Sequence, residues 1–525
     1  MQFKKTSFIE NQSALNPNQQ DDMYYKTIFI VICLIWFVLW SALPLLIYQG
    51  PYVDTSENII IGREILWGYD KHPYFGVWIM RLVFTISGSF YLSFIFSQIA
   101  IFIFLLSSWK LARYFLSPGK ALLSILFLLS NPVYSITSIM FNQNIILIAL
   151  WALIILFYCK ALLNQKISDW ILLGIFCGLG LMTKYFCVFL FAPMALWLLF
   201  TAQGRASFKH IGLYLCVVSF LIIIIPNVIW LFENNFASIV YAAHKSDINH
   251  EHSINIIKHL ISPLTVLGMV LGSFAYSIIT FFICFREKNI SASPEIPGSM
   301  KEFVLFIFLA PLTFVCLFTL ITGVIVKGDW LFTLCGTAGL IIILFWKPEL
   351  TRKKIKCYLI FLAIFCFCSV ILHSAYVLYY TPYLQTNCVS LCKPTLALSD
   401  NITAAWHKKF NTSLRYLAGD IMLSSRISLF SKDHPESVFI SSEYNHRNKT
   451  SIPDYYHHGA VLIWNGQKPP EWLDEFKDYN ISDITTEPYP RLVKPWFRKF
   501  MYNVFGLNPK EDFYSFAFIK PHHLD

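Results

Sequence analysis

Ionisable side chains gather in one part of an otherwise apolar sequence, the stretch from residue 49 to residue 89. If this stretch is helical, at about 100° per residue, the carboxylates of Asp54, Glu57 and Glu64 fall within about 80° of one another. A carboxylate beside a substrate can act as a general base, because it can take a proton from an attacking hydroxyl group. The alternative is a solvated loop with incidental acids, but charge concentrated beside apolar runs favours a functional role.

The same stretch also has an apolar side and a polar turn. Opposite the acids lie four apolar residues, Ile59, Ile60, Leu66 and Trp67. This division predicts an interfacial helix along a membrane surface, with its carboxylates toward solvent or a cavity. A turn with Asp70, Lys71 and His72 follows, and a second apolar stretch begins near Tyr74.

Long apolar runs must hold this polar stretch in place. Hydrophobic residues make up 56% of the 525 residues and charged residues only 14%, whereas soluble domains carry about 25% charge. The difference indicates that lipid replaces water over most of the surface. The net charge is +10, but the basic residues lie in short gaps between apolar runs. That pattern sets membrane orientation, so we expect no nucleic-acid partner.

About eleven runs are long enough to cross a bilayer as helices. We place these spans near residues 26–48, 90–109, 121–139, 144–163, 170–183, 185–201, 211–231, 260–285, 303–323, 330–346 and 357–380. Alternate short loops, such as 110–120 and 347–356, are rich in Lys and Arg, which predicts a cytoplasmic N-terminus. An odd number of spans then puts the C-terminal part on the opposite face. We expect a multi-pass membrane protein.

Composition divides the chain into three parts. We expect residues 1–24 to form a polar cytoplasmic tail, residues 25–381 an all-α membrane domain, and residues 382–525 a soluble periplasmic domain. Two long outer loops interrupt the membrane domain, at 49–89 and 232–259.

The soluble domain is expected to be a small α/β or α+β module. Strand-like and helical stretches alternate in it, with strands near 438–440 and 460–464 and helices near 402–417 and 470–479. Cys388 and Cys392 open the domain. In an oxidising compartment they would form a local disulfide, and free thiols are the alternative.

The motifs of the first outer loop come in a known order. Asp54 follows the first span, Arg63 and Glu64 come some nine residues later, and a polar turn and Trp78 follow. This order resembles the first periplasmic loop of the GT-C glycosyltransferases that use polyprenyl-phosphate sugars. They include the protein O-mannosyltransferases, the aminoarabinose transferases of lipid A and the Rgt-type glycosyltransferases. Thr55 stands where these proteins have a second acid, and Tyr74 where they have a second proline.

The resemblance continues through residues 25–345. Its later motifs are Asn144 to Trp151, Gly174 to Tyr185, Pro226 to Phe236 and Lys327 to Trp330. The resemblance implies a GT-C bundle that transfers a sugar from a polyprenyl-phosphate donor to lipid A, another glycan or a protein. Transfer would take place on the extracytoplasmic face and invert the anomeric carbon. The resemblance to the Rgt-type and lipid A enzymes also implies a bacterial inner membrane, and the endoplasmic reticulum is the alternative.

The resemblance also implies roles for individual residues. Asp54 would be the general base. The donor phosphate would meet three groups, Lys184, His72 and His244. The supporting residues would be Glu57, Arg63, Glu64, Asp70 and Asn144.

Other interpretations of these residues stay open. Lys184 could be a lysine that snorkels to the membrane surface, and the glycines before it could serve close helix packing. His72 could bind phosphate, ligate a metal or orient Asp54. The histidine spacing matches no zinc motif, so we assign no cofactor and leave a divalent metal ion open.

Other functions also stay open. Thr55 and Asn144 replace acids, and Asn cannot act as a base at neutral pH. A non-catalytic relative of these transferases is therefore one alternative. A transporter or flippase of polyprenyl lipids is the other, although charges gathered at one face and the absence of repeated halves argue against it.

Overall fold

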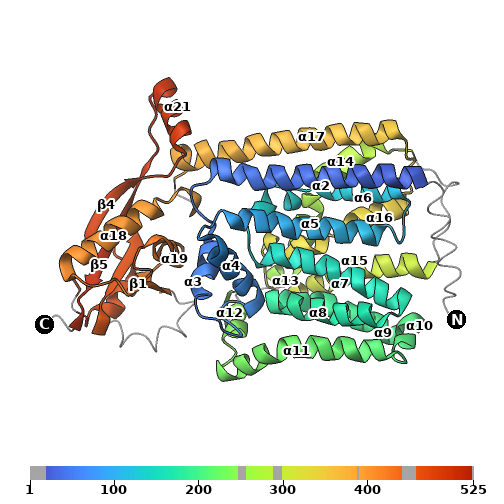
Figure 1. Cartoon of the computed structure of the whole chain (residues 1–525), viewed down its shortest axis with the longest axis horizontal. Helices are drawn as coiled ribbons and strands as arrows, with labels where there is room; N and C mark the ends of the chain where they lie inside the picture. Colours follow the sequence, from blue (N-terminus) through green and yellow to red (C-terminus); the bar gives the residue numbers. More distant parts are fainter. Residues whose placement is uncertain are drawn as a thin grey trace.

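The chain folds into a helical bundle and a smaller unit built on a sheet, which lie end to end (Figure 1). The computed structural model describes residues 19–245, 256–287, 298–386, 390–439, 457–479 and 481–522. The helices of the bundle extend as far as Leu384, and the sheet unit follows from residue 390.

Seven helices among the described residues are long and apolar enough to cross a membrane. They are α2 (Gln19–Ile47), α5 (Leu92–Ala112), α7 (Gln143–Asn164), α11 (Ile211–Glu233), α13 (Ile256–Ser273), α15 (Gly298–Thr322) and α17 (Arg352–Ala375), which continues as the π-helix η5 (Tyr376–Leu384). Two bent pairs raise the number to nine, namely α6 (Pro118–Leu129) with Pro132–Ile139, and the 3-10 helix η4 (Gly328–Cys335) with α16 (Ala338–Trp346). The chain is therefore an integral, multi-pass membrane protein.

The structure thus supports seven to nine spans, where the sequence predicts about eleven. The predicted spans at 170–183 and 185–201 contain the shorter helices α8 (Ile167–Thr183) and α9 (Val188–Phe200). Hydropathy predicts both as spans because a short apolar helix packed among other helices has the same composition as one that crosses lipid.

α8 packs closely against α11 because its glycines leave no side chain between the two helices. A Cβ atom added to Gly174 would lie 2.1 Å from the carbonyl oxygen of Cys216, and one added to Gly178 would lie 2.8 Å from the Cβ of Ile223. Close helix packing therefore accounts for these glycines. It also fixes the position of Lys184, which follows α8 directly.

The sheet unit has five strands in the order β2-β1-β3-β5-β4. Their bounds are Tyr416–Gly419 (β1), Glu436–Phe439 (β2), Ala460–Asn465 (β3), Thr485–Pro490 (β4) and Glu511–Ile519 (β5). β2, β1 and β3 are parallel, and β5 runs antiparallel to its neighbours β3 and β4. The strands predicted near 438–440 and 460–464 correspond to β2 and β3, so the unit is a small mixed α/β module.

Helices cover both faces of this sheet. On one face lie α18 (Thr395–Phe410) and α19 (Ile421–Phe430), whose apolar side chains pack on β1, β3 and β5. On the other face lies the 3-10 helix η7 (Glu471–Phe476). Cys392, just before α18, is disulfide-bonded, whereas Cys388 falls outside the described residues.

The first outer loop differs from its prediction. It contains two helices, α3 (Val53–Ile61) and α4 (Tyr74–Ser87), and α3 ends before Glu64 and Trp67. Residues 55–60 of α3 are all buried, Glu57 included. Of the carboxylates that were expected toward solvent or a cavity, Glu57 is therefore not solvent-exposed, because α19 of the sheet unit packs over α3, whereas Asp54 is 43% exposed.

Candidate active site

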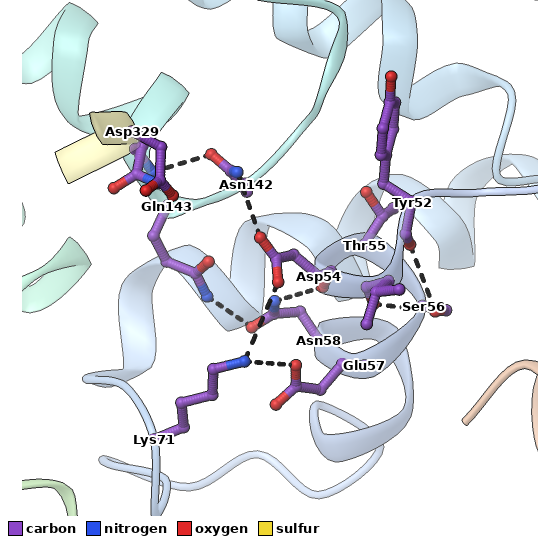
Figure 2. A network of polar contacts seen from close by, with 12 residues as sticks. Tyr52, Asp54, Thr55, Ser56, Glu57, Asn58, Lys71, Asn142, Gln143 and Asp329 are labelled. Atoms are coloured by element: carbon purple, nitrogen blue, oxygen red, sulfur yellow. Dashed lines mark hydrogen bonds and ion pairs between the residues drawn. The ribbon is translucent and has the colours of Figure 1, made fainter. Parts of the chain in front are cut away.

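Asp54 lies in the first turn of α3, and 43% of its side chain is exposed beside buried neighbours. Hydrogen bonds from buried side chains hold the helix in place (Figure 2). The Thr55 hydroxyl donates to the carbonyl oxygen of Phe141 at 2.9 Å, and the Gln143 amide donates to the Asn58 side chain at 2.6 Å. The Asp54 carboxylate is thus fixed to the loop that precedes α7.

The sheet unit holds α3 at both ends. Before the helix, the buried guanidinium of Arg426 in α19 donates to the carbonyl oxygen of Pro51. After the helix, Arg63 donates to the carbonyl oxygens of Pro435 at 2.8 Å and Ser428 at 3.2 Å. The position of Asp54 therefore depends on the docking of the sheet unit onto the bundle.

Lys71 brings a positive charge from the following turn to the two acids of α3. Its Nζ lies 2.7 Å from the nearer oxygen of Glu57 and 3.9 Å from Asp54 Oδ1 (Figure 2). Burial opposes the charge on Lys71, but Glu57 and Asp54 outweigh it and raise its pKa. The charge of Lys71 thereby balances the charge of Glu57, whose side chain is only 1% exposed. Asp54 remains the more exposed of the two carboxylates.

A second set of polar groups approaches Asp54 from the N-terminus of α7. The Asn142 amide donates to Asp54 Oδ2 at 3.3 Å, and the Asn142 side-chain oxygen accepts from the backbone N–H of Asn144 at 3.0 Å. Asn144 in turn donates to Asp329 at 2.9 Å and accepts from Lys184 Nζ at 2.6 Å. A continuous network therefore joins Asp54 to Lys184.

Lys184 is held in a buried, partly aromatic site. Its Nζ lies 4.4 Å from the centre of the Trp330 ring. Burial lowers the pKa of Lys184 to about 7, against the favourable effect of Asp329 and Asp54, while Lys71 and Lys327 lower it further. Lys184 therefore changes between its neutral amine and its charged ammonium form near neutral pH. A bound anion would favour the ammonium form.

His72 is influenced electrostatically by Lys71 and Lys184. Burial lowers its pKa well below the ordinary value, and Lys71 and Lys184 add to the effect. The imidazole is therefore neutral at pH 7. A neutral imidazole can donate one hydrogen bond to an anion without adding charge.

The structure brings together some of the predicted site residues and separates others. Asp54, Glu57, Asn144, Lys184 and His72 share the cluster described above. Arg63 instead binds backbone carbonyls of the sheet unit, where burial and the nearby Arg81 lower its pKa to about 10.

The other predicted residues lie elsewhere or are not described. The Glu64 side chain is exposed after the end of α3, and Asp70 is half-buried in the turn before Lys71. His244 belongs to the backbone of α12 (Ala237–Lys245), but its side chain is not among those described.

Four residues of the network were not predicted as site residues. Lys71 lies in the polar turn of the first outer loop. Asn142 precedes the motif from Asn144 to Trp151, and Gln143 lies between Asn142 and Asn144. Asp329 falls in the motif from Lys327 to Trp330. An acid at the start of an apolar stretch was the available signal for Asp329, since such a charge is costly without a partner.

The described residues offer no group of three or more His, Cys, Asp or Glu side chains arranged to hold a metal ion. A surface cavity of about 470 Å³ lies in the sheet unit rather than around Asp54. Its lining includes Arg415, Asp433 and His458.

Comparison with known proteins identifies relatives of the bundle. The family model described as dolichyl-phosphate-mannose-protein mannosyltransferase matches residues 71–230. This range holds Lys71, Asn142, Asn144 and Lys184, and begins after Asp54. The lipid A galacturonosyltransferase RgtD of Rhizobium johnstonii is 21% identical over 229 residues, which are 43% of this chain and 47% of that protein. The match thus spans about half the length of this curated relative.

The fold is similar to that of ArnT from Cupriavidus metallidurans. With the structure of ArnT bound to undecaprenyl phosphate the TM-score is 0.56 at 12% identity, over 94% of this chain and 98% of ArnT. With apo ArnT the TM-score is 0.52 over the same shares. The fold similarity includes the sheet unit, because it extends over nearly the whole length of both proteins. Together with the partial matches in sequence, it confirms that the chain resembles the GT-C membrane glycosyltransferases.

Proposed function

We propose that this protein transfers a sugar from a polyprenyl-phosphate donor to an acceptor hydroxyl, with Asp54 as the general base. The observation that carries the proposal is the position of the Asp54 carboxylate. It is the open acid of an otherwise buried helix, and a polar network connects it to a buried lysine.

The reaction can be written as a single displacement. The acceptor oxygen forms a bond to the anomeric carbon while the bond from that carbon to the phosphate oxygen breaks. The acceptor proton passes to Asp54, and the electron pair of the broken bond stays on the phosphate. Attack opposite the leaving phosphate inverts the anomeric carbon.

Positive charge stabilises the departing phosphate. Lys184 supplies it best. Among the described residues its ammonium donates to the neutral amide of Asn144, whereas Lys71 is paired with the carboxylate of Glu57. His72 adds a neutral donor. A phosphate that binds at Lys184 would raise the pKa of this lysine and complete its protonation.

The two positions that lack the acid of the family pattern are compatible with activity. Thr55 stands in place of an acid, but its side chain is buried and anchors α3 to Phe141. Asn144 also stands in place of an acid, and Asp329 provides a carboxylate 2.9 Å from it. The local charge balance is kept, because the acid comes from a different segment.

The relatives suggest the donor and acceptor classes. ArnT binds undecaprenyl phosphate, and the curated relative is a lipid A galacturonosyltransferase. We therefore propose a polyprenyl-phosphate donor and lipid A as the first acceptor to test, with other glycans and proteins next. We also propose a bacterial inner membrane, with residues 382–525, which contain the sheet unit, in the periplasm and residues 1–24 in the cytoplasm.

The test uses the purified full chain in nanodiscs with a radiolabelled polyprenyl-phosphate sugar and lipid A. Asp54→Asn removes the base and keeps the shape, and Glu64→Gln is the matched control because Glu64 is an exposed acid of the same loop. We expect a loss of transfer of about 10²-fold or more in Asp54→Asn, and none in Glu64→Gln.

Equal transfer by the wild type and Asp54→Asn would refute the role of Asp54. Movement of the lipid across the bilayer without transfer would support the transporter alternative. Donor binding with neither would support a non-catalytic relative.

A further inference from the structure

The helix α21 (Pro495–Phe505) lies where the sheet unit meets the ends of two membrane spans. Just before it, Lys494 donates to the carbonyl oxygen of Leu45 in α2 at 3.0 Å, and Arg491 donates to that of Thr381 in η5 at 2.9 Å. After it, Lys510 donates to the carbonyl oxygen of Leu384 at 2.7 Å. The segment that carries α21 is therefore fixed at the level where α2 and η5 end.

Its direction differs from that of the spans. In Figure 1, α21 stands crosswise to α17 and projects beyond the outline of the bundle, next to the end of α17. A helix crosswise to membrane spans, at the level of their ends, runs along the membrane surface.

The faces of α21 are divided sharply. Phe497 and Met501 pack against Tyr379 and Tyr383 of η5 and form its attachment to the bundle. Beside this attached face runs a stripe at every fourth position, made of Trp496, Phe500 and Val504. These three side chains are 58%, 48% and 57% exposed. Side chains four residues apart share one face of a helix.

The side of α21 away from this stripe is basic. It carries Arg498 and Lys499, with the ring of Tyr502, 58% exposed, between them. The surrounding segment, residues 491–510, contains five basic residues and no Asp or Glu. A basic face opposite an aromatic face is the pattern of helices that lie in the headgroup region of anionic membranes.

The bundle beside α21 has the surface that lipid covers. Tyr376 and Tyr380 in η5 are 41% and 45% exposed, and their rings stack. Exposed Tyr and Trp side chains concentrate where a membrane meets water. The exposed stripe of α21 therefore continues an interfacial aromatic surface that the spans begin.

We propose that α21 is a lipid-binding element of the sheet unit. Trp496, Phe500 and Val504 enter the outer part of the acyl layer, and Arg498 and Lys499 meet the phosphates of anionic lipids. This contact ties the sheet unit to the bilayer independently of the site at α3.

The test uses the full chain with the photoreactive residue benzoylphenylalanine at position 500, in nanodiscs of phosphatidylglycerol. The control carries the same residue at Ile484, which is 43% exposed. Ile484 directly precedes β4 and Arg491 directly follows it, so seven steps of about 3.3 Å place Ile484 about 23 Å from Arg491. We expect lipid adducts by mass spectrometry at position 500 and none at position 484.

A second measurement tests the charges. Arg498→Gln/Lys499→Gln should lower the adduct yield at position 500 severalfold in phosphatidylglycerol and little in phosphatidylcholine. A variant that folds but gives no lipid adduct at position 500 overturns the proposal. Crosslinks from position 500 to a second copy of the chain, in place of lipid, also overturn it and identify α21 as a contact between copies.

Discussion

α3 and α21 are short helices at the same end of the bundle, and each reverses the usual distribution of side chains. α3 buries Ser56, Glu57 and Asn58 almost completely, whereas α21 exposes Trp496 and Phe500. In a soluble protein the first would be costly without partners, and the second would be an unusual apolar surface.

The two reversals have different causes. The polar side chains of α3 are buried because the sheet unit covers the helix and because Lys71 and Gln143 satisfy its carboxylate and amide. The apolar side chains of α21 are exposed because lipid, rather than protein, is their expected neighbour. At this boundary, buried polar groups therefore indicate chemistry and exposed apolar groups indicate contact with the membrane.

The largest effect should come from breaking the ion pair under α3. Lys71→Met leaves the buried carboxylate of Glu57 without its cation, which should destabilise the protein by about 3–5 kcal/mol. Thermal unfolding in detergent measures the loss, and Lys71→Met/Glu57→Gln should recover part of it. Lys477→Met is the control, since Lys477 forms an exposed pair with Asp474. An equal effect of both lysine substitutions would contradict the importance of burial at α3.

The next effect concerns pH and the charge of Lys184. Its folded-state pKa is lowered to about 7, so its ammonium is present below pH 7 and is lost as the pH rises through this value. If the ammonium of Lys184 stabilises the leaving phosphate, only the protonated enzyme is active. Because kcat/KM reports the protonation state of the free enzyme, it should fall about tenfold per pH unit above pH 7. Lys184→Arg keeps the charge at all these pH values and should remove the alkaline decrease. A decrease that persists in Lys184→Arg would assign it to another group.

A smaller effect is expected from the hydroxyl that anchors α3. Thr55→Val keeps the shape but leaves the carbonyl oxygen of Phe141 without its donor, which should cost about 1–3 kcal/mol of stability. Thr85→Val is the matched control, because the Thr85 hydroxyl donates an exposed hydrogen bond to the carbonyl oxygen of Arg81 within α4. Equal melting temperatures for the two variants would show that α3 is not held through Thr55.

The sequence predicted the parts of this arrangement that depend on local pattern. Apolar runs predicted the bundle, and strand-like runs predicted β2 and β3. The concentration of charged residues in 49–89 predicted a functional role for this loop. Asp54 and Lys184 were singled out by motifs that resemble GT-C proteins, and the structure joins them in one network.

The rest depends on contacts between distant residues. Glu64 fits a helical pattern with Asp54, but α3 ends at Ile61. Arg63, which does not fit that pattern, binds carbonyls some 370 positions away. Asp329 lies 185 positions from its partner Asn144. α3 is buried because α19 packs on it. The periodicity of the α3 sequence cannot predict this contact, because α19 belongs to a distant segment of the chain.

The smallest effect is expected at α21. Phe500→Ser removes an exposed ring that the described residues of the protein do not enclose, so the free energy of unfolding in detergent should stay within about 0.5 kcal/mol of the wild type. Trp406→Ser is the contrasting variant, because this buried ring packs in the core of the sheet unit and its loss should be severe. In phosphatidylglycerol nanodiscs, Phe500→Ser should instead increase the hydrogen exchange of α21, because the helix loses a lipid contact. An unchanged exchange rate would mean that the membrane does not hold this helix. A large loss of stability in detergent would mean that protein contacts already enclose its exposed stripe.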